Sequence, residues 1–180
     1  MRRTYQSDNR SCGKGMLWRF DGVVREKKFG RAEFGEMSMI IRPWKKQDID
    51  KIAQIEAFSF RDPWSRENLL DVLKYPYYQS FLAEEEGQVC GYGCLIVMYE
   101  IAEVANIAVA APHRGRGIGR AILERMHYVA KTLGAEQCLL EVRVSNLSAI
   151  ALYEKCGYVG YGIRERYYGD EDALLMKKDL

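Results

Sequence analysis

The sequence predicts an α+β (α/β) domain, in which a central mixed, mostly antiparallel sheet is flanked by helices. Three observations lead to this fold class. Short β-branched runs alternate with helical apolar spacings in the order β-α-α-β-β-β-α-β-α-β-β. The chain has 180 residues and 48% hydrophobic content, which is enough for one sizeable core. Between Ala105 and Gly134, a short strand, a glycine-rich turn and a long amphipathic helix follow one another directly.

Regular patterning begins at Met39. Residues 39–42 read as a strand that Pro43 ends, and apolar residues with helical spacing follow Asp48. Ser65 is a good N-cap for a second helix, which we expect to run to about Tyr75. The later elements are predicted as strands over 80–84, 89–99, 101–109, 138–142, 158–166 and 173–177, a long helix ending at Gly134, and a helix from Asn146 to Gly157.

Residues 1–38 show no sustained period and hold nine Lys/Arg against five Asp/Glu. We interpret them as a flexible N-terminal extension that precedes a domain over residues 39–180. Two alternatives remain open: an upstream start before a true initiator at Met37 or Met39, or a basic docking arm. The formal net charge of +2 gives no argument for a nucleic-acid partner.

The five cysteines are odd in number, scattered and without a C-x-x-C pair. His113 and His127 have no ligand spacing to any of them, so we expect no metal site. No apolar run reaches the ~20 residues of a spanning helix, so we expect no membrane partner. Reduced thiols and this composition favour a cytoplasmic protein.

The glycine-rich turn is the most informative segment. Gly115, Gly117 and Gly119 remove side chains from the start of the long helix, leaving unpaired N–H groups, while three arginines surround them. We interpret this turn as a seat for a pyrophosphate; the alternative is an ordinary turn with a basic rim. A dinucleotide fingerprint from Gly115 would need glycine where Arg120 stands, and the Gly-Lys-Ser/Thr of a P-loop is absent.

Arg114, Gly117 and Gly119 match the pattern R-x-x-G-x-G after a strand and before a long helix. In this the sequence resembles the GNAT superfamily of acyl-CoA-dependent N-acetyltransferases, whose order of elements is also the one predicted for residues 39–180. The resemblance implies acetyl-CoA as co-substrate. Acetyl transfer to an amine then requires a group that accepts the proton of the amine and one that protonates the departing thiolate.

Glu141 lies within an otherwise apolar strand, where partial burial would tune a carboxylate for accepting a proton. The alternative is a structural carboxylate paired with Arg143 or another cation. Tyr153 lies on the following helix, and a phenol is protonated at neutral pH, so its hydroxyl can hydrogen-bond to a departing thiolate and protonate it; the alternative is a core aromatic. Asn146 either contacts the pantetheine amide or caps the helix. The backbone of residues 107–109 offers a strand edge to pantetheine.

Further motifs follow in one order: LEVRVSN (140–146), AIALYE (149–154), GY (157–158), RYY (166–168) and EDA (171–173), with PWS at 63–65. Together they resemble the ribosomal-protein-alanine N-acetyltransferase family of RimI type. This resemblance implies Glu141 as general base and Tyr153 as general acid. It implies acetyl-CoA contacts at Ile107, Ala108, Val109, Gly115, Arg116, Gly117, Ile118, Gly119, Arg120 and Asn146.

The resemblance implies acetylation of the N-terminal alanine of a small-subunit ribosomal protein, by direct transfer in a ternary complex. Two other functions remain open: acetylation of a small amine or a lysine side chain, and CoA binding without turnover. Glu103 is a rival base, because some GNAT enzymes use a carboxylate from its strand.

Overall fold

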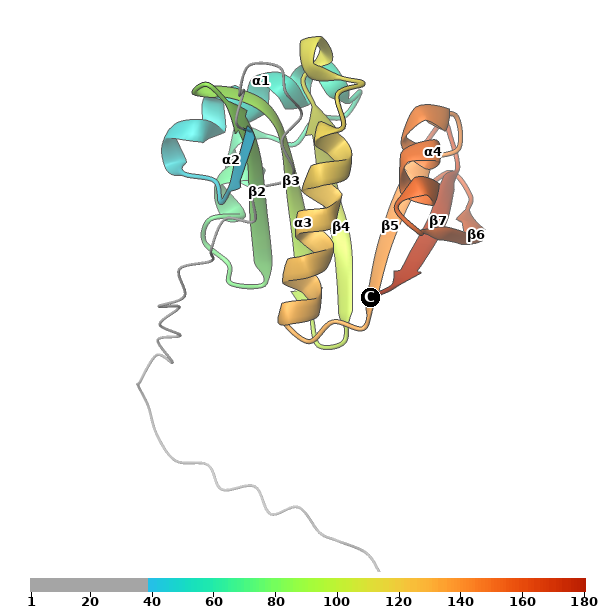
Figure 1. The fold of residues 1–180 in the computed structure, drawn as a ribbon. Coiled ribbons are helices and arrows are strands. Elements are labelled where there is room, and N and C mark those ends of the chain that lie inside the picture. Colours follow the sequence, from blue (N-terminus) through green and yellow to red (C-terminus); the bar gives the residue numbers. More distant parts are fainter. Residues whose placement is uncertain (1–38) are drawn as a thin grey trace, which may run out of the picture. The chain divides into compact units, whose positions relative to one another are not determined.

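A computed structural model describes residues 39–180, so the predicted extension over residues 1–38 lies outside the described residues. Across the described part, one sheet has the strand order β1-β2-β3-β4-β5-β7-β6 (Figure 1). Its strands are β1 (Met39–Arg42), β2 (Tyr78–Glu85), β3 (Gln88–Met98), β4 (Ile101–Val109), β5 (Gln137–Arg143), β6 (Val159–Arg164) and β7 (Ala173–Asp179). The α-helices are α1 (Ile49–Ser59), α2 (Arg66–Asp71), α3 (Ile118–Thr132) and α4 (Leu147–Lys155), with 3-10 turns η1 (Lys46–Asp48) and η2 (Ala111–His113).

The sheet is mixed and mostly antiparallel, as predicted. Only the β4–β5 pair is parallel, and its ladder covers three positions, Ile101–Glu103 against Gln137–Leu139. The neighbouring β3–β4 and β5–β7 ladders run nearly the full length of their strands. The predicted order of elements and the fold class are therefore confirmed.

One face of the sheet is covered by α3, which lies along β3 and β4 (Figure 1). Its buried side chains recur with the predicted helical spacing: Ile118, Ile122, Leu123, Met126 and Ala130. A Cβ on Gly93 would overlap Met126 and Ile122, so the absence of a side chain there lets α3 approach β3 closely. The inward side chains of α4 belong to the same core cluster.

The other face of β1–β4 is covered by α1 and α2. Alternation along β2 shows the two faces, because Phe81 and Ala83 join the α3 cluster while Leu82 joins the α1 cluster. Trp44 and Tyr92 meet edge to face in the α1 cluster, with ring centroids 5.6 Å apart. Among the described residues, this second cluster contains none from β5.

Most predicted boundaries agree with the structure to within two residues, but the predicted end of α2 was wrong. The Ser65 hydroxyl accepts from the Asn68 N–H at 3.1 Å, so the predicted N-cap is confirmed. The helix nevertheless ends at Asp71 rather than about Tyr75, and Leu73 and Lys74 donate to carbonyls three residues back. Pro76 disfavours helical backbone at Tyr75, so the helix could not have continued through that residue. Within residues 39–180, no helix combines the length and apolarity needed to cross a membrane.

Candidate active site

The strands β4 and β5 separate just where the predicted site residues begin. Their ladder stops at the Glu103–Leu139 pair, so the β5-facing backbone edge of residues 104–109 has no ladder partner among the described residues. An extra residue, Ala105, interrupts the ladder to β3, because Cys94 pairs with Asn106 and Leu95 with Val104. A bulge of this kind turns the following residues and is frequent beside active sites. The edge predicted for pantetheine, residues 107–109, is therefore accessible to an added extended chain.

The glycine turn has the backbone expected of an anion seat. Gly115 and Gly117 adopt φ of 76° and 80°, which favours glycine, and Gly117 is the N-cap of α3 without a capping side chain. Ala121 is the first residue of the turn and helix whose N–H donates to a backbone carbonyl, that of Gly117 at 3.0 Å. Within the described chain, the N–H groups of residues 115–120 thus have no backbone acceptor. Six consecutive free donors at a helix N-terminus favour a bound phosphate.

The arginines of this turn are all engaged with other groups of the chain. Arg114 Nε donates to the Val109 carbonyl at 3.0 Å, Arg116 pairs with Glu85 at 2.9 Å, and Arg120 pairs with Glu124 at 2.8 Å. Arg116 and Arg120 are thus paired with carboxylates, whereas Arg114 is bonded to a neutral carbonyl and keeps its charge beside the free backbone amides.

Gly119 connects this seat to α4. A Cβ on Gly119 would lie 3.2 Å from Leu152 Cδ2, so the start of α3 packs tightly against the helix that carries Tyr153. The glycine turn and the predicted acid therefore belong to one packed unit.

Glu141 is only partly exposed and is paired with a cation that the sequence did not identify. Arg164 Nη1 lies 2.6 Å from Glu141 Oε1, and a hydrogen bond to Glu141 raises the pKa of Tyr167 to about 12. The Tyr168 hydroxyl also approaches the Glu141 carbonyl, at 3.4 Å. The alternative of a carboxylate paired with a cation therefore applies to Glu141. Its partner is Arg164 and not Arg143.

Arg143 instead joins the segment between β6 and β7. Its guanidinium contacts Asp170 and Glu171, each at 3.2 Å, and lies over the Tyr168 ring at 4.2 Å from its centroid. It also lies 3.5 Å from Asp62, in the segment between α1 and α2. This arginine therefore bridges two segments that flank the open face of β5.

Glu103 lies on the same face as Glu141. It pairs with Leu139 in the parallel ladder, and side chains two residues apart on a strand share a face. Partial desolvation, with the charge of Glu141 as a second cause, raises the pKa of Glu103. The rival base thus borders the same opening.

Tyr153 is buried in the core, in T-shaped contact with Tyr158 at a centroid distance of 5.8 Å. Burial raises the pKa of Tyr153, so the phenol keeps its proton and is available as a donor. Among residues 39–180 its hydroxyl has no hydrogen-bond partner. The core-aromatic interpretation is confirmed, and the role as general acid stays a prediction.

Asn146 caps α4: its Oδ1 accepts from the Ala149 N–H at 3.2 Å. The capping alternative is therefore confirmed.

Glu56 was not singled out from the sequence as a site residue. It is 1% exposed on α1, and its Oε1 accepts from the Trp64 N–H at 2.8 Å and from Asn106 Nδ2 at 2.9 Å. Its Oε2 has no partner among the described residues, and burial raises the pKa of Glu56. This carboxyl joins the segment after α1 to the bulged part of β4. The sequence did contain a signal for this residue, because Glu56 occupies a helix position at which the spacing predicts an apolar side chain.

Comparison with known proteins gives consistent relatives. The sequence model of the acetyltransferase (GNAT) family matches residues 49–158. A Bacillus subtilis protein, by its name a candidate ribosomal protein bS18-alanine N-acetyltransferase, is 36% identical over 76% of this chain and 92% of its own. The ribosomal protein bS18-alanine N-acetyltransferase of Escherichia coli (strain K12) is 33% identical over 72% of this chain and 89% of its own.

A solved structure agrees with these relatives. The crystal structure of the ribosomal-protein-S18-alanine N-acetyltransferase from Escherichia coli covers 79% of this chain and 94% of its own, with a TM-score of 0.73 and 31% identity. The family match, the relatives and the fold confirm the predicted resemblance. The chain therefore belongs to the acetyltransferase (GNAT) family.

Proposed function

We propose that this acetyltransferase moves the acetyl group of acetyl-CoA to the α-amine of a protein N-terminus, specifically the N-terminal alanine of a small-subunit ribosomal protein. The observation that carries the proposal is the separation of β4 from β5 beside six free backbone amides, with Glu141 on one bordering strand. The names of relatives that are 33–36% identical support the acceptor. A ribosomal acceptor also favours action in the cytoplasm, as does the presence of four free, buried cysteines in the described chain.

The donor seat consists of the turn and the strand edge. The N–H groups of residues 115–120 would hold the pyrophosphate, and the backbone edge of residues 107–109 would hold the pantetheine as an added strand. The cradle suits such a ligand, because its donors are backbone amides and the glycines leave room for close approach. Bound there, acetyl-CoA supplies the activated thioester.

Glu141 is the proposed base. The acceptor amine must lose a proton as its nitrogen attacks the thioester carbonyl, and the Glu141 carboxylate would take that proton. Arg164 and Tyr167 fix the carboxylate in place. Glu103 remains the alternative base within the same opening.

Tyr153 is the proposed acid. As the C–N bond forms and the C–S bond breaks, its hydroxyl would donate a proton to the departing thiolate. A buried phenol with a raised pKa is protonated before the reaction, so its hydroxyl can hydrogen-bond to the sulfur from the start. Because Oδ1 of Asn146 caps α4, the Nδ2 group of the same side chain would contact the pantetheine.

The acceptor would enter over the face of β5 that α1 and α2 leave open. Tyr167 and Tyr168 border this face, and the ion pairs of Arg143 with Asp62 and Asp170 connect the two flanking segments. No covalent enzyme intermediate is required, so both substrates would be bound together. The catalytic domain would span residues 39–180.

Peptide acetylation followed by mass spectrometry tests the proposal. We expect acetyl transfer from acetyl-CoA to the α-amine of peptides that begin with alanine, with slower transfer to peptides that begin with serine or methionine. Polyamines and an N-terminally blocked peptide with an internal lysine are the comparison substrates. Transfer to these instead would favour the small-amine or lysine alternative, and CoA binding without release of thiol would favour a binding protein.

A further inference from the structure

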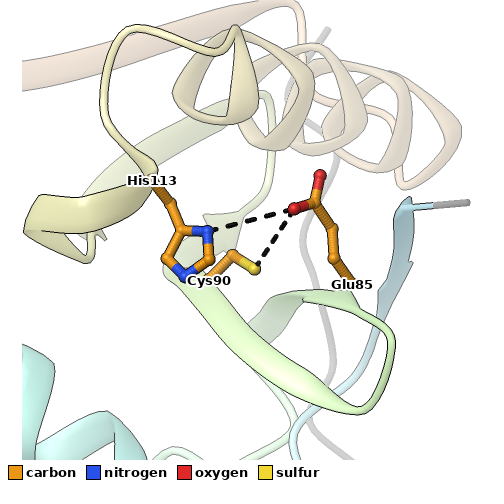
Figure 2. Close-up of side chains that lie close together, drawn as sticks. All are labelled: Glu85, Cys90 and His113. Atoms are coloured by element: carbon orange, nitrogen blue, oxygen red, sulfur yellow. Dashed lines mark hydrogen bonds and ion pairs between the residues drawn. The ribbon is translucent and has the colours of Figure 1, made fainter. Parts of the chain in front are cut away.

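Three side chains of the kinds that bind zinc converge beside the cofactor turn. Glu85 at the end of β2, Cys90 in β3 and His113 in η2 point toward one another (Figure 2). Glu85 Oε2 lies 3.8 Å from Cys90 Sγ and 3.9 Å from His113 Nδ1, and all three ligand atoms lie within 4.8 Å of one another. Cysteine, histidine and glutamate are the usual zinc ligands in proteins.

A bulge in β3 and a backbone hydrogen bond to η2 bring these residues together. Ala83 pairs with Gly91 and Glu84 with Val89, so Cys90 is the extra residue of a bulge, which turns its side chain toward the α3 face. The Ala110 N–H donates to the Cys90 carbonyl at 2.9 Å and fixes the start of η2. The cluster is therefore shaped by the backbone of three elements.

A cation already occupies part of this cluster. Arg116 Nη2 lies 2.9 Å from Glu85 Oε2, and Nη1 lies 3.1 Å from His113 Nδ1. Since the guanidinium can only donate, His113 Nδ1 accepts, and its lone pair points toward the same place as the carboxylate. The side chains of Glu85 and His113 are 13% and 20% exposed, so this place is largely shielded from water.

We propose that Glu85, Cys90 and His113 form a binding site for a divalent cation of the zinc class, which takes the place of the Arg116 guanidinium. Zinc bonds of about 2.0–2.3 Å in a tetrahedron separate ligand atoms by roughly 3.3–3.8 Å, close to the observed spacings. The charges balance: the Cys90 thiol releases its proton to solvent, and the metal then neutralises one thiolate and one carboxylate. Water completes the fourth position.

The ion pair of Arg116 with Glu85 does not by itself account for the cluster. The guanidinium gives Glu85 and His113 a hydrogen-bond partner. It does not explain why the bulge in β3 brings the Cys90 thiol to the same centre. The sequence predicted no metal site because the histidines and cysteines lack the spacing of a local ligand motif. The three ligands proposed here come from separate positions of the chain, 85, 90 and 113.

Titration of the metal-free, full-length protein with Co²⁺ tests the site, because thiolate ligation gives a characteristic near-ultraviolet charge-transfer band. We expect the band to saturate at one equivalent and to disappear when Zn²⁺ is added. Cys90→Ser should abolish the band. Cys94→Ser is the matched control, because Cys94 is also fully buried in β3 but belongs to the α1 cluster, and it should keep the band.

Two further variants keep the test decisive if Cys90→Ser fails to fold, which circular dichroism would reveal. His113→Gln should weaken Co²⁺ binding by about tenfold or more, and Arg116→Met should strengthen it by removing the competing cation. A wild-type protein without the band, a band that survives in folded Cys90→Ser, or affinities unchanged in both other variants would overturn the proposal. None of these measurements depends on acetyltransferase activity, so failure here and failure of the proposed function are distinguishable.

Discussion

The two sides of the sheet differ in how completely they are covered. On the β1–β4 side, helices pack on both faces, and the buried residues are almost all apolar. On the β5–β7–β6 side, α4 shares the α3 face, while the opposite face carries Glu141, Arg143 and their partners. The glycine turn leads into α3 on the first side, and the proposed base Glu141 lies on the second.

Several contacts hold the sides together, including the α3 core cluster, which contains residues of both sides, and the ion pair of Arg143 with Asp62. Two further ones involve β5 directly. One is the short β4–β5 ladder. The other is a buried polar chain, in which His127 Nε2 of α3 lies 2.9 Å from the Tyr158 hydroxyl and this hydroxyl donates to Cys138 Sγ of β5 at 3.0 Å. The opening between β4 and β5 therefore borders a core that both sides share.

The largest expected effect is on the second side. Glu141→Gln keeps the shape of the side chain but removes the proton acceptor, so we expect kcat to fall by about 10³- to 10⁴-fold. Acetyl-CoA affinity, measured by calorimetry, should change little. Steady-state acetylation of an alanine-starting peptide provides the measurement.

Glu103→Gln is the matched control for that experiment. Its side chain borders the same opening from β4, on the first side. We expect it to retain most of the activity. If it loses turnover while Glu141→Gln remains active, the base belongs to the other strand and our assignment is wrong.

The next effect concerns α4. Tyr153→Phe removes a hydroxyl that has no partner within residues 39–180, so the free energy of unfolding should change by less than about 0.5 kcal/mol. If the hydroxyl protonates the thiolate, kcat should fall by about 10²-fold. Urea denaturation and steady-state kinetics on the same preparation separate the two roles. Unchanged kcat would leave Tyr153 as a core aromatic alone.

The polar chain between the sides predicts a pH effect on stability. Burial, and then the charge of Lys178, lowers the pKa of His127 to about 4 from the usual 6.5. The unfolded chain therefore binds more protons between these values, and this contribution to stability is present above pH 6.5 and is lost as the pH falls toward 4.

We expect this residue to remove roughly 2 kcal/mol from the free energy of unfolding between pH 7 and pH 4.5. Urea denaturation at several pH values measures the change. His127→Gln retains a partner for Tyr158 and should show a smaller loss over the same interval. Equal losses in the two proteins would contradict a neutral, buried His127.

The smallest expected effect is on the first side, at the cofactor turn. Gly117 has φ of 80°, so Gly117→Ala introduces about 1–2 kcal/mol of backbone strain at the N-cap of α3. We expect the KM for acetyl-CoA to rise by about tenfold while the KM for the peptide stays constant. Gly134→Ala is the control, since Gly134 also has a positive φ, 92°, but follows the opposite end of α3. An equal rise in that variant would exclude a specific role of the turn.

The comparison of the two sides also explains what the sequence could predict. The glycine turn, the Ser65 cap and the α3 stripe depend on residues within a few positions of one another, so local patterns were sufficient. The fold class followed from the order of such elements. The relation between Glu141 and Arg164 spans 23 positions and depends on how β6 pairs with β7, which no local pattern contains.

Bulges in β3 and β4 account for much of what the sequence did not predict. Extra residues at Cys90 and Ala105 change which face the neighbouring side chains occupy, and simple alternation does not show where a strand departs from its register. For this reason the cluster around Cys90 and the contact between Asn106 and Glu56 emerged only from the structure. The end of α2 was missed although Pro76 gave a readable signal.

A crystal structure with a CoA–peptide bisubstrate analogue tests the central claim most directly, through the position of the analogue's sulfur. Our account predicts the sulfur within hydrogen-bond distance of the Tyr153 hydroxyl, with pantetheine along residues 107–109 and the peptide nitrogen on the Glu141 side. A sulfur outside the opening between β4 and β5 would contradict it.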